Sequence, residues 1–299
     1  MSPKEQQEDR ENIAKLSSVR NAHLSVASGD TPATSPEIQA NPSGPTPVEE
    51  PLAIISDIHG NYEALSEVMN EIRKRNIKNI CCLGDVIGYG PNPRECLDTV
   101  IENCQFTIMG NHDFAIFFEP FNFNTAAENA AYWTRNQFET DPDRARRNRR
   151  WRYLGNMQTR AVNKRFLAVH GSPRRPINEY IFPDDIYSAT QKISMIFDRI
   201  THLCFVGHTH VPGVFVVQPD FYSPDDLKYR YDITEEKAII NVGSVGQPRD
   251  HDPRASFAIL HSDHVEFVRI AYDVNTTVEK VRSIDALDNF LGQRLLEGT

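Results

Sequence analysis

Residues 52–90 read LAIISDIHGNYEALSEVMNEIRKRNIKNICCLGDVIGYG, and this stretch sets the pattern of the fold. The run LAIIS at 52–56 is apolar and rich in β-branched side chains, which predicts a buried strand. The next segment places Leu65, Val68 and Ile72 at helical spacing, so it predicts an amphipathic helix. KNICCLG then predicts a second strand. A strand, a helix and a strand in this order favour a parallel pair joined by a right-handed crossover.

The same alternation continues along the chain. The helix RECLDTVIEN and the strand CQFTIMG follow, and FLAVH and HLCFVG are two further predicted strands on either side of a predicted helix over 183–199. The pattern then becomes strand-rich, with VPGVFVVQ, KYRYDI, KAIINVG, ASFAIL and HVEFVRI separated by turn residues. We interpret this strand-rich part as a second sheet packed on the first. The predicted fold class is therefore α/β.

Composition and pattern divide the chain into three parts. Residues 1–50 are rich in Ser, Pro, Glu, Gln and Asn and poor in large apolar side chains, so we expect a disordered tail. We expect one folded domain over 51–275. Within it, 122–165 interrupts the alternation with a helical pattern and is predicted to form a cap or insertion near the site. Residues 276–299 are predicted to be a C-terminal helical segment.

The overall composition is that of a globular protein with a negative charge. The chain has 299 residues, 39% hydrophobic content and a formal net charge of -9. This charge gives no overall attraction to nucleic acid or to an anionic membrane, so an anionic substrate needs local cations. The five cysteines show no CxxC spacing, which favours buried, reduced thiols in a cytoplasmic protein. We expect neither a cleaved leader nor a membrane-spanning segment.

Five short polar clusters follow apolar runs, at the points where the predicted strands end. Of the ten histidines in the chain, five lie in these clusters. In open α/β proteins the carboxyl ends of the strands are where active sites gather, so we expect these side chains to converge. Each cluster taken alone is more often a turn or a satisfied polar pair, and only their joint occurrence indicates a site. The clusters are Asp57-Ile58-His59, Gly84-Asp85, Gly110-Asn111-His112-Asp113, His170-Gly171 and Gly207-His208-Thr209-His210.

The residue types in these clusters are those that bind divalent cations. Residues two apart in an extended strand point to the same side, so Asp57 and His59 can hold one cation together, as can His208 and His210 if their segment stays extended. The two carboxylate oxygens of Asp85 can bridge a pair of cations. Histidine, aspartate and asparagine without thiolates suit Mn, Fe, Zn, Co or Ni. We therefore expect two divalent metal ions that hold a bridging hydroxide and clamp a phosphoryl group, and the predicted reaction is hydrolysis of phosphomonoesters or phosphodiesters.

The order D-x-H, GD, GNH[DE], an isolated H and GHxH resembles the calcineurin-like metallophosphoesterase superfamily over about residues 52–260. That resemblance implies a two-sheet α/β/β/α sandwich. More locally, GDVIGYGPNP, VHGSP and NVGSVGQPRDHDPRAS are similar to a bacterial branch of small metallophosphoesterases that are described as phosphatases or phosphodiesterases. Fold and metal centre do not choose between a protein phosphatase-like and a nucleotide phosphodiesterase activity.

The resemblance also implies a role for each polar residue. His112 would protonate the leaving oxygen or stabilise the transition state. The form GDxxD common in the family has a second aspartate that orients this histidine, whereas this chain has Gly88 there, and Asp113 is the substitute that the sequence offers. The implied ligands are Asp57, His59, Asp85 and His210 for one metal, and Asp85, Asn111, His170 and His208 for the second.

Arginines near and away from these clusters allow two interpretations each. Arg249 and Arg254 follow the predicted strand AIINVG and can bind a substrate phosphate as planar forks. The alternative is a surface ion pair with Asp250 or Asp252. The basic run at 144–152 is interpreted as a solvated helical face rather than a nucleic-acid contact, because the whole chain is acidic.

The expected partner is thus a phosphate-ester substrate, with contact to membrane or nucleic acid disfavoured. Two other functions stay open. One is a non-catalytic scaffold on the same fold, although a scaffold has no reason to retain the full set of polar side chains. The other is a nuclease that uses the same metal pair, and the arginine run is its motive.

Overall fold

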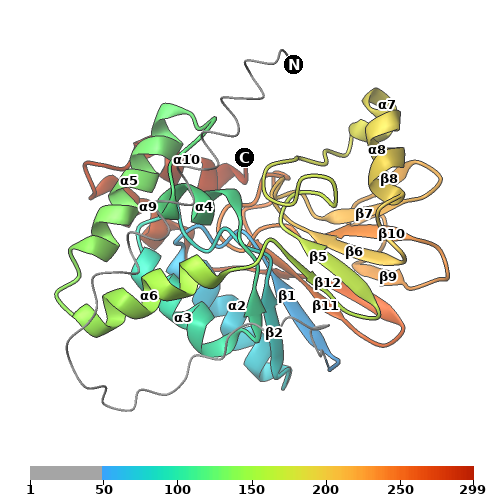
Figure 1. Cartoon of the computed structure of the whole chain (residues 1–299), viewed down its shortest axis with the longest axis horizontal. Coiled ribbons are helices and arrows are strands. Elements are labelled where there is room, and N and C mark those ends of the chain that lie inside the picture. The colour runs from blue at the N-terminus through green and yellow to red at the C-terminus, as the bar shows by residue number, and fades with distance from the viewer. Residues whose placement is uncertain (1–48) are drawn as a thin grey trace, which may run out of the picture. The chain divides into compact units, whose positions relative to one another are not determined.

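The computed structural model describes residues 49–299, which fold into two six-stranded sheets with helices on their outer faces (Figure 1). The strands are β1 (Leu52–Ile55), β2 (Asn79–Cys82), β3 (Phe106–Thr107), β4 (Arg160–Val162), β5 (Phe166–Val169), β6 (Leu203–Val206), β7 (Gly213–Val216), β8 (Asp220–Tyr222), β9 (Arg230–Asp232), β10 (Ala238–Asn241), β11 (Ala255–Leu260) and β12 (His264–Ile270). The helices are α2 (Tyr62–Lys74), α3 (Pro93–Asn103), α4 (Asn111–Phe117), α5 (Thr125–Glu139), α6 (Arg144–Asn156), α7 (Asp185–Ser188), α8 (Thr190–Phe197), α9 (Val274–Arg282) and α10 (Asn289–Glu297).

Both sheets are mixed. The first has the strand order β3-β2-β1-β11-β12-β9 and the second has the order β4-β5-β6-β10-β7-β8. In the first sheet β1, β2 and β3 are parallel, as the strand and helix alternation predicts. In the second sheet β5, β6 and β10 are parallel. Each sheet therefore has a parallel part whose strands all end at one edge.

Alternate residues of β1 show why the sheets stack. Leu52 and Ile54 point into the apolar core between the two sheets, where Phe205 of β6 also lies. Ile55 points to the other side and packs with Leu65 of α2. A third apolar cluster joins the outer face of the second sheet to α8. This period of two buries both faces of each sheet and confirms the predicted α/β/β/α sandwich.

The strand-rich second half does not form the second sheet by itself, so that interpretation is wrong. β11 pairs antiparallel with β1, and β12 and β9 follow it in the first sheet. β5 and β6, which precede the strand-rich part, belong to the second sheet. An apolar, β-branched run reports that a segment is a strand, but it carries no information on which partner the strand chooses.

Several local boundaries also differ from the prediction. The helix expected over 183–199 is two helices, α7 and α8, because Ala189 has non-helical backbone angles (φ -141°, ψ 47°). The short strands β4 and β8 were not predicted. Of the predicted tail at 1–50, residues 1–48 lie outside the described residues, while Glu50 forms an ion pair with Arg165. The C-terminal segment contains two helices, α9 and α10.

The segment 122–165 contains α5, α6 and β4. Arg135 of α5 donates to the carbonyl oxygens of Ala115 (3.1 Å) and Ile116 (2.9 Å), which fixes α5 against α4. The basic run lies in α6, but the expectation of a solvated face is wrong for Arg150. Its buried guanidinium donates to Asp98 (2.6 Å) and also pairs with Asp141. Part of the run therefore neutralises carboxylates within the domain.

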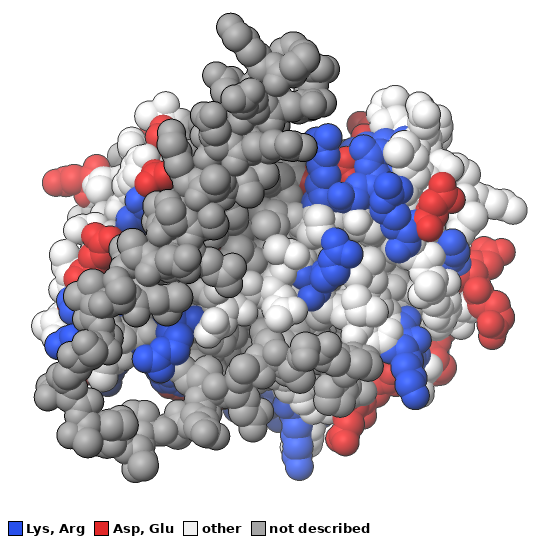
Figure 2. All heavy atoms as spheres, viewed as in Figure 1, with Lys and Arg blue, Asp and Glu red and all other residues white. Residues whose placement is uncertain are grey.

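Surface charge is not uniform despite the negative total. On the face viewed in Figure 2, Lys and Arg side chains gather beside α7 and α8. The five cysteines are free thiols. Among the described residues, the helices are too short or too polar to span a lipid bilayer.

Candidate metal centre

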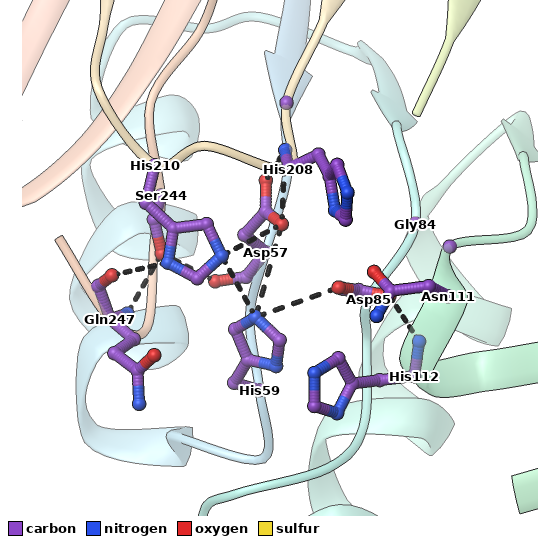
Figure 3. A network of polar contacts seen from close by, with 12 residues as sticks. Asp57, His59, Gly84, Asp85, Asn111, His112, His208, His210, Ser244 and Gln247 are labelled. Carbon is purple, nitrogen blue, oxygen red and sulfur yellow. Dashed lines mark hydrogen bonds and ion pairs between the residues drawn. The ribbon is translucent and has the colours of Figure 1, made fainter. Parts of the chain in front are cut away.

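The polar clusters that follow β1, β2, β5 and β6 meet at the edge where the parallel strands end. Loops from the two sheets are joined there by backbone hydrogen bonds. Val245 N–H donates to the carbonyl oxygen of Ser56 (2.9 Å), and Gly246 N–H donates to that of Asp57 (2.9 Å). In Figure 3 the side chains of Asp57, His59, Asp85 and His210 point toward one another. The structure thus brings together residues that are far apart in the sequence.

Asp57, His59 and His210 form one set of side chains, which we call the first cluster. The Nε2 atom of His210 lies 3.2 Å from Oδ1 of Asp57, and the Nε2 atoms of His59 and His210 are 3.2 Å apart. His59 Nε2 lies 3.8 Å from the same Asp57 oxygen. All three side chains are buried, and their ligand atoms are close enough to share one metal ion.

The second cluster consists of Asp85, Asn111, His170 and His208. Its centre is His170 Nε2, which lies 3.2 Å from Asp85 Oδ2, 3.2 Å from Asn111 Oδ1 and 3.1 Å from His208 Nδ1. Asp85, His170 and His208 form another buried group that could hold a metal ion.

Asp85 connects the two clusters. Its Oδ2 atom lies 3.2 Å from His170 Nε2 and 3.7 Å from His59 Nε2. Its other oxygen, Oδ1, accepts a hydrogen bond from the backbone N–H of His112 (2.8 Å). One carboxylate is therefore fixed between the two groups, which is the position a bridging ligand needs.

Hydrogen bonds to backbone carbonyls select the nitrogen that each of two histidines turns inward. His170 Nδ1 lies 2.8 Å from the carbonyl oxygen of Leu83, and His210 Nδ1 lies 2.5 Å from that of Gln247. A carbonyl oxygen only accepts, so Nδ1 carries the hydrogen and Nε2 is left for a cation. Pairs of imidazole nitrogens at 3.1 to 3.2 Å in a buried site fit a cation between them, and such outer bonds orient metal-binding histidines.

The predicted reason for the convergence is wrong, although the convergence itself is observed. β1 ends at Ile55 and β6 ends at Val206, so the D-x-H and H-x-H residues are not in extended strand. Instead Asp57, His59, Asp85, His208 and His210 all have positive φ, between 50° and 68°. Left-handed backbone is strained in residues with a side chain, and such strain concentrates at functional sites. Tight turns, not strand alternation, aim these side chains.

Two glycines permit the close approach of these turns. A side chain on Gly207 would place its Cβ 2.4 Å from Oδ2 of Asp57, and one on Gly110 would place it 2.0 Å from Oδ1 of Asp85. Neither position can hold a larger residue while the carboxylates stay where they are. The glycines of the GN and GH pairs are thus part of the site geometry.

The charges of the two carboxylates set the protonation of the centre. Burial on its own raises the pKa of Asp57 and Asp85, but neighbouring imidazoles hold both pKa values well below the ordinary range. Burial on its own lowers the pKa of His170, yet Asp85 and Asp57 outweigh it and raise this pKa to about 9. For His208, burial and the neighbouring His170 lower the pKa to about 3. The metal-free centre is therefore net negative and attracts cations.

His112 lies beside this centre. Burial lowers its pKa to about 4, and Arg249 adds to that shift while Asp85 opposes it. Asp113 does not orient it. The Asp113 carboxylate accepts instead from the backbone N–H groups of Asp85 (2.7 Å) and Val86 (3.1 Å), so it fixes the loop after β2. The suggestion that Asp113 replaces the second aspartate of GDxxD is wrong.

The two candidate substrate-binding arginines have different surroundings. Arg254 is largely exposed and donates to Asp252 (2.6 Å), which is the ion pair given above as the alternative. Arg249 is half-buried, and Asp250 pairs with Arg269 instead of with it. Nη2 of Arg249 donates to Gln247 Oε1 (2.8 Å), while its buried Nε has no partner among the described residues. Of these two arginines, Arg249 is the one without an acidic partner among the described residues.

Some residues around the site were not predicted from the sequence. Ser244 donates its hydroxyl to the carbonyl oxygen of Asp57 (2.7 Å), and Gln247 supplies the carbonyl that holds His210. Both lie in the phrase NVGSVGQPRD, so its similarity to family members was the available signal. Tyr180 stacks on His208 with ring centroids 3.8 Å apart, and no pattern in the sequence pointed to it.

Comparison with known proteins identifies the family and the fold. A model of the calcineurin-like phosphoesterase superfamily domain matches residues 51–264. An uncharacterized protein of Methanocaldococcus jannaschii, MJ0912, is 34% identical over 268 residues, which are 84% of this chain and 99% of that protein. The crystal structure of a metallophosphoesterase from Sphaerobacter thermophilus is similar at a TM-score of 0.70 and 36% identity, covering 83% of this chain and 98% of that one. A hypothetical protein of Pyrococcus horikoshii, PH1004, shares the fold at a TM-score of 0.63 and 17% identity, over 83% of this chain and 98% of that one.

The fold and these matches define a phosphoester hydrolase. The chain belongs to the calcineurin-like phosphoesterase superfamily, whose members typically depend on divalent metals. Its buried His and Asp groups are able to bind such metals.

Proposed function

We propose that this protein hydrolyses phosphate esters with a pair of divalent cations, one in each cluster and both in contact with Asp85. The observation that carries the proposal is the position of Asp85 Oδ2, 3.2 Å from His170 Nε2 and 3.7 Å from His59 Nε2. The first cation would be held by Asp57, His59, Asp85 and His210, and the second by Asp85, Asn111, His170 and His208. When bound, two such cations supply the positive charge that polarises a phosphoryl group and lowers the pKa of water.

The chain's own residues then bind the phosphoryl group and stabilise the leaving oxygen. Arg249 presents guanidinium N–H groups that are not used by an acidic partner among the described residues, so they donate to the phosphoryl oxygens. His112, which is neutral at pH 7 in the substrate-free protein, donates a hydrogen bond to the leaving oxygen as negative charge develops there. A neutral imidazole can donate this hydrogen bond, and it adds no positive charge that would repel the nearby cations.

The proposal is tested by metal removal and replacement. Hydrolysis of p-nitrophenyl phosphate and of bis-p-nitrophenyl phosphate is measured after chelation, and again after addition of Mn, Co, Ni, Zn or Mg. We expect no turnover in the chelated protein and recovery with at least one of the borderline metals. The ratio of the two rates reports whether monoesters or diesters are preferred. Undiminished turnover in protein shown by elemental analysis to be metal-free would disprove the proposal.

The roles of the two arginines are separated by a matched pair of variants. Arg249→Ala removes charge-assisted hydrogen bonds to the phosphoryl group, so we expect kcat/KM to fall by about 10- to 100-fold. Arg254→Ala removes only an exposed ion pair, and we expect kcat/KM within about twofold of the unmodified protein. Equal losses in the two variants would contradict the assignment of Arg249.

A further inference from the structure

His112 is held in an unusual way, because no side chain binds its outer ring nitrogen. Its Nδ1 atom is buried and has no hydrogen-bond partner among the described residues. Gly88, which stands where the form GDxxD has an aspartate, lies directly against this atom. A Cβ on Gly88 would come within 2.5 Å of His112 Nδ1, and the backbone there has a positive φ of 93°. This chain therefore has no space at Gly88 for a carboxylate that could orient the ring.

Aromatic rings surround His112 instead. The ring centroid of Tyr89 lies 4.3 Å from that of His112, and the centroid of Phe123 lies 4.5 Å from it. Tyr89 also packs on His59 at 4.7 Å. Such ring pairs stabilise one another beyond the area they bury. The imidazole is thus confined between two neighbours that make no hydrogen bond with it.

Phe123 lies in the segment that joins α4 to α5. Hydrogen bonds fix this segment at both of its ends. On the α5 side, Asn124 accepts a hydrogen bond from the backbone N–H of Ala127 (2.9 Å) and begins the helix. On the α4 side, Arg135 holds the carbonyl oxygens at the end of that helix. The segment 122–165 therefore delivers an anchored aromatic ring to the site. Phe121, two residues earlier, is 77% exposed and makes no ring contact with His112.

We propose that Phe123 and Tyr89 are positioning residues, which hold the His112 imidazole toward the leaving oxygen in place of the carboxylate that Gly88 excludes. This inference rests on the proposed function, in which His112 stabilises the leaving oxygen. Because the constraint is packing, it sets the direction of the N–H group without adding charge. Loss of the constraint then reduces the hydrogen bond to the leaving oxygen and leaves phosphoryl binding by Arg249 intact.

The test compares good and poor leaving groups in Phe123→Ala. With an alkyl phosphate, whose leaving oxygen needs stabilisation, we expect kcat to fall by about 10- to 100-fold. With 2,4-dinitrophenyl phosphate, whose leaving oxygen needs little stabilisation, we expect kcat to change by less than about threefold. KM changes little for either ester. Phe123→Tyr keeps the ring and is expected to restore most of the alkyl phosphate rate, and Phe121→Ala is the matched control that leaves both rates unchanged.

A double-mutant cycle with His112→Ala shows whether Phe123 acts through the histidine. If it does, His112→Ala/Phe123→Ala is no slower on the alkyl phosphate than His112→Ala alone. Additive losses, equal losses with both esters, an effect confined to KM, or no loss in Phe123→Ala would each overturn the positioning role. A His112→Ala variant with unchanged rates on both esters would instead overturn the proposed role of His112 itself. Circular dichroism and metal content show that each variant is folded and loaded.

Discussion

The first cluster and the second cluster each contain one histidine that donates to a backbone carbonyl and one that does not. His210 donates to Gln247 and His170 donates to Leu83, whereas the outer nitrogens of His59 and His208 have no partner among the described residues. The unanchored rings are packed against tyrosines, Tyr89 at 4.7 Å from His59 and Tyr180 at 3.8 Å from His208. In each cluster, therefore, one histidine ring is oriented by a hydrogen bond to a backbone carbonyl and the other by packing against a tyrosine.

Their protonation differs. In the first cluster, burial and neighbouring charges hold the pKa of His59 and of His210 below the ordinary value, so both rings are neutral at pH 7. In the second cluster, Asp85 and Asp57 outweigh burial and raise the pKa of His170 to about 9. A cation entering the first cluster meets ready ligands, but one entering the second must displace a proton. The two sites are therefore expected to differ in how metal binding depends on pH.

The largest effect is expected where the clusters share a residue. Asp85→Asn removes the charge of the carboxylate that we propose contacts both cations, so we expect kcat/KM to fall by at least about 1,000-fold and both metals to be lost at micromolar concentrations. Elemental analysis and hydrolysis of p-nitrophenyl phosphate measure the two effects. Asp252→Asn, which changes a carboxylate paired with Arg254 on the surface, is the control and retains metal and activity. Loss of one metal only would show that Asp85 does not bridge.

Removal of one histidine from each cluster separates them. His59→Ala affects the first cluster and His170→Ala affects the second, and in each we expect one metal per chain where the unmodified protein binds two. The loss of kcat/KM is expected to be about 100-fold or more, because a two-metal clamp needs both cations. Binding isotherms with Mn give the stoichiometry. Two metals retained in His170→Ala would place this histidine outside the ligand set.

The strand ends and the order of polar clusters were enough to predict which residues meet, and the comparison of the clusters shows why. Each implied ligand lies within four residues after the end of a strand, and parallel strands end at a common edge. A sequence motif therefore carried the positions of Asp57, His59, Asp85, His170, His208 and His210. It could not carry the orientation of five of them, because the turns that aim these side chains depend on left-handed backbone at non-glycine residues, which local propensity disfavours. The five are Asp57, His59, Asp85, His208 and His210.

The aromatic residues that pack on His208 and His112 could not be predicted from the sequence, for a related reason. Tyr180 and Phe123 lie in connecting segments, where no hydrophobic period constrains an aromatic residue to one face. Their contacts with His208 and His112 are tertiary and need the loops to be folded. The prediction of which strands share a sheet was wrong for the same reason. The partner of β11 is β1, which lies about 200 residues earlier in the chain.

The difference in protonation predicts a pH dependence for one cluster only. The folded pKa of His170, about 9, lies above the ordinary value of 6.5, so the metal-free ring is protonated between these values and a metal must release that proton. Apparent metal affinity in His59→Ala, which keeps the second cluster, is expected to rise by up to about tenfold per pH unit from pH 7 to 9 and then to level off. In His170→Ala, which keeps the first cluster, the affinity is expected to stay nearly constant. Competition titrations at pH 7, 8 and 9 measure both, and equal slopes would contradict the assigned difference.

The smallest effect is expected from the ring that packs on His208. Tyr180→Ala removes a stacking partner at 3.8 Å and an interplanar angle of 17°, but it removes no ligand. Stacking of this kind stabilises a ring orientation by about 0.5 to 1.5 kcal/mol, so we expect metal affinity of the second cluster to fall by about 2- to 10-fold. The first cluster keeps its affinity, because its unanchored ring packs on Tyr89. Tyr180→Phe retains the ring and the affinity, and Tyr187→Ala, at a site 78% exposed in the neighbouring α7, changes neither cluster. A loss of affinity that is equal in both clusters would show that Tyr180 supports the loop as a whole and not the orientation of His208.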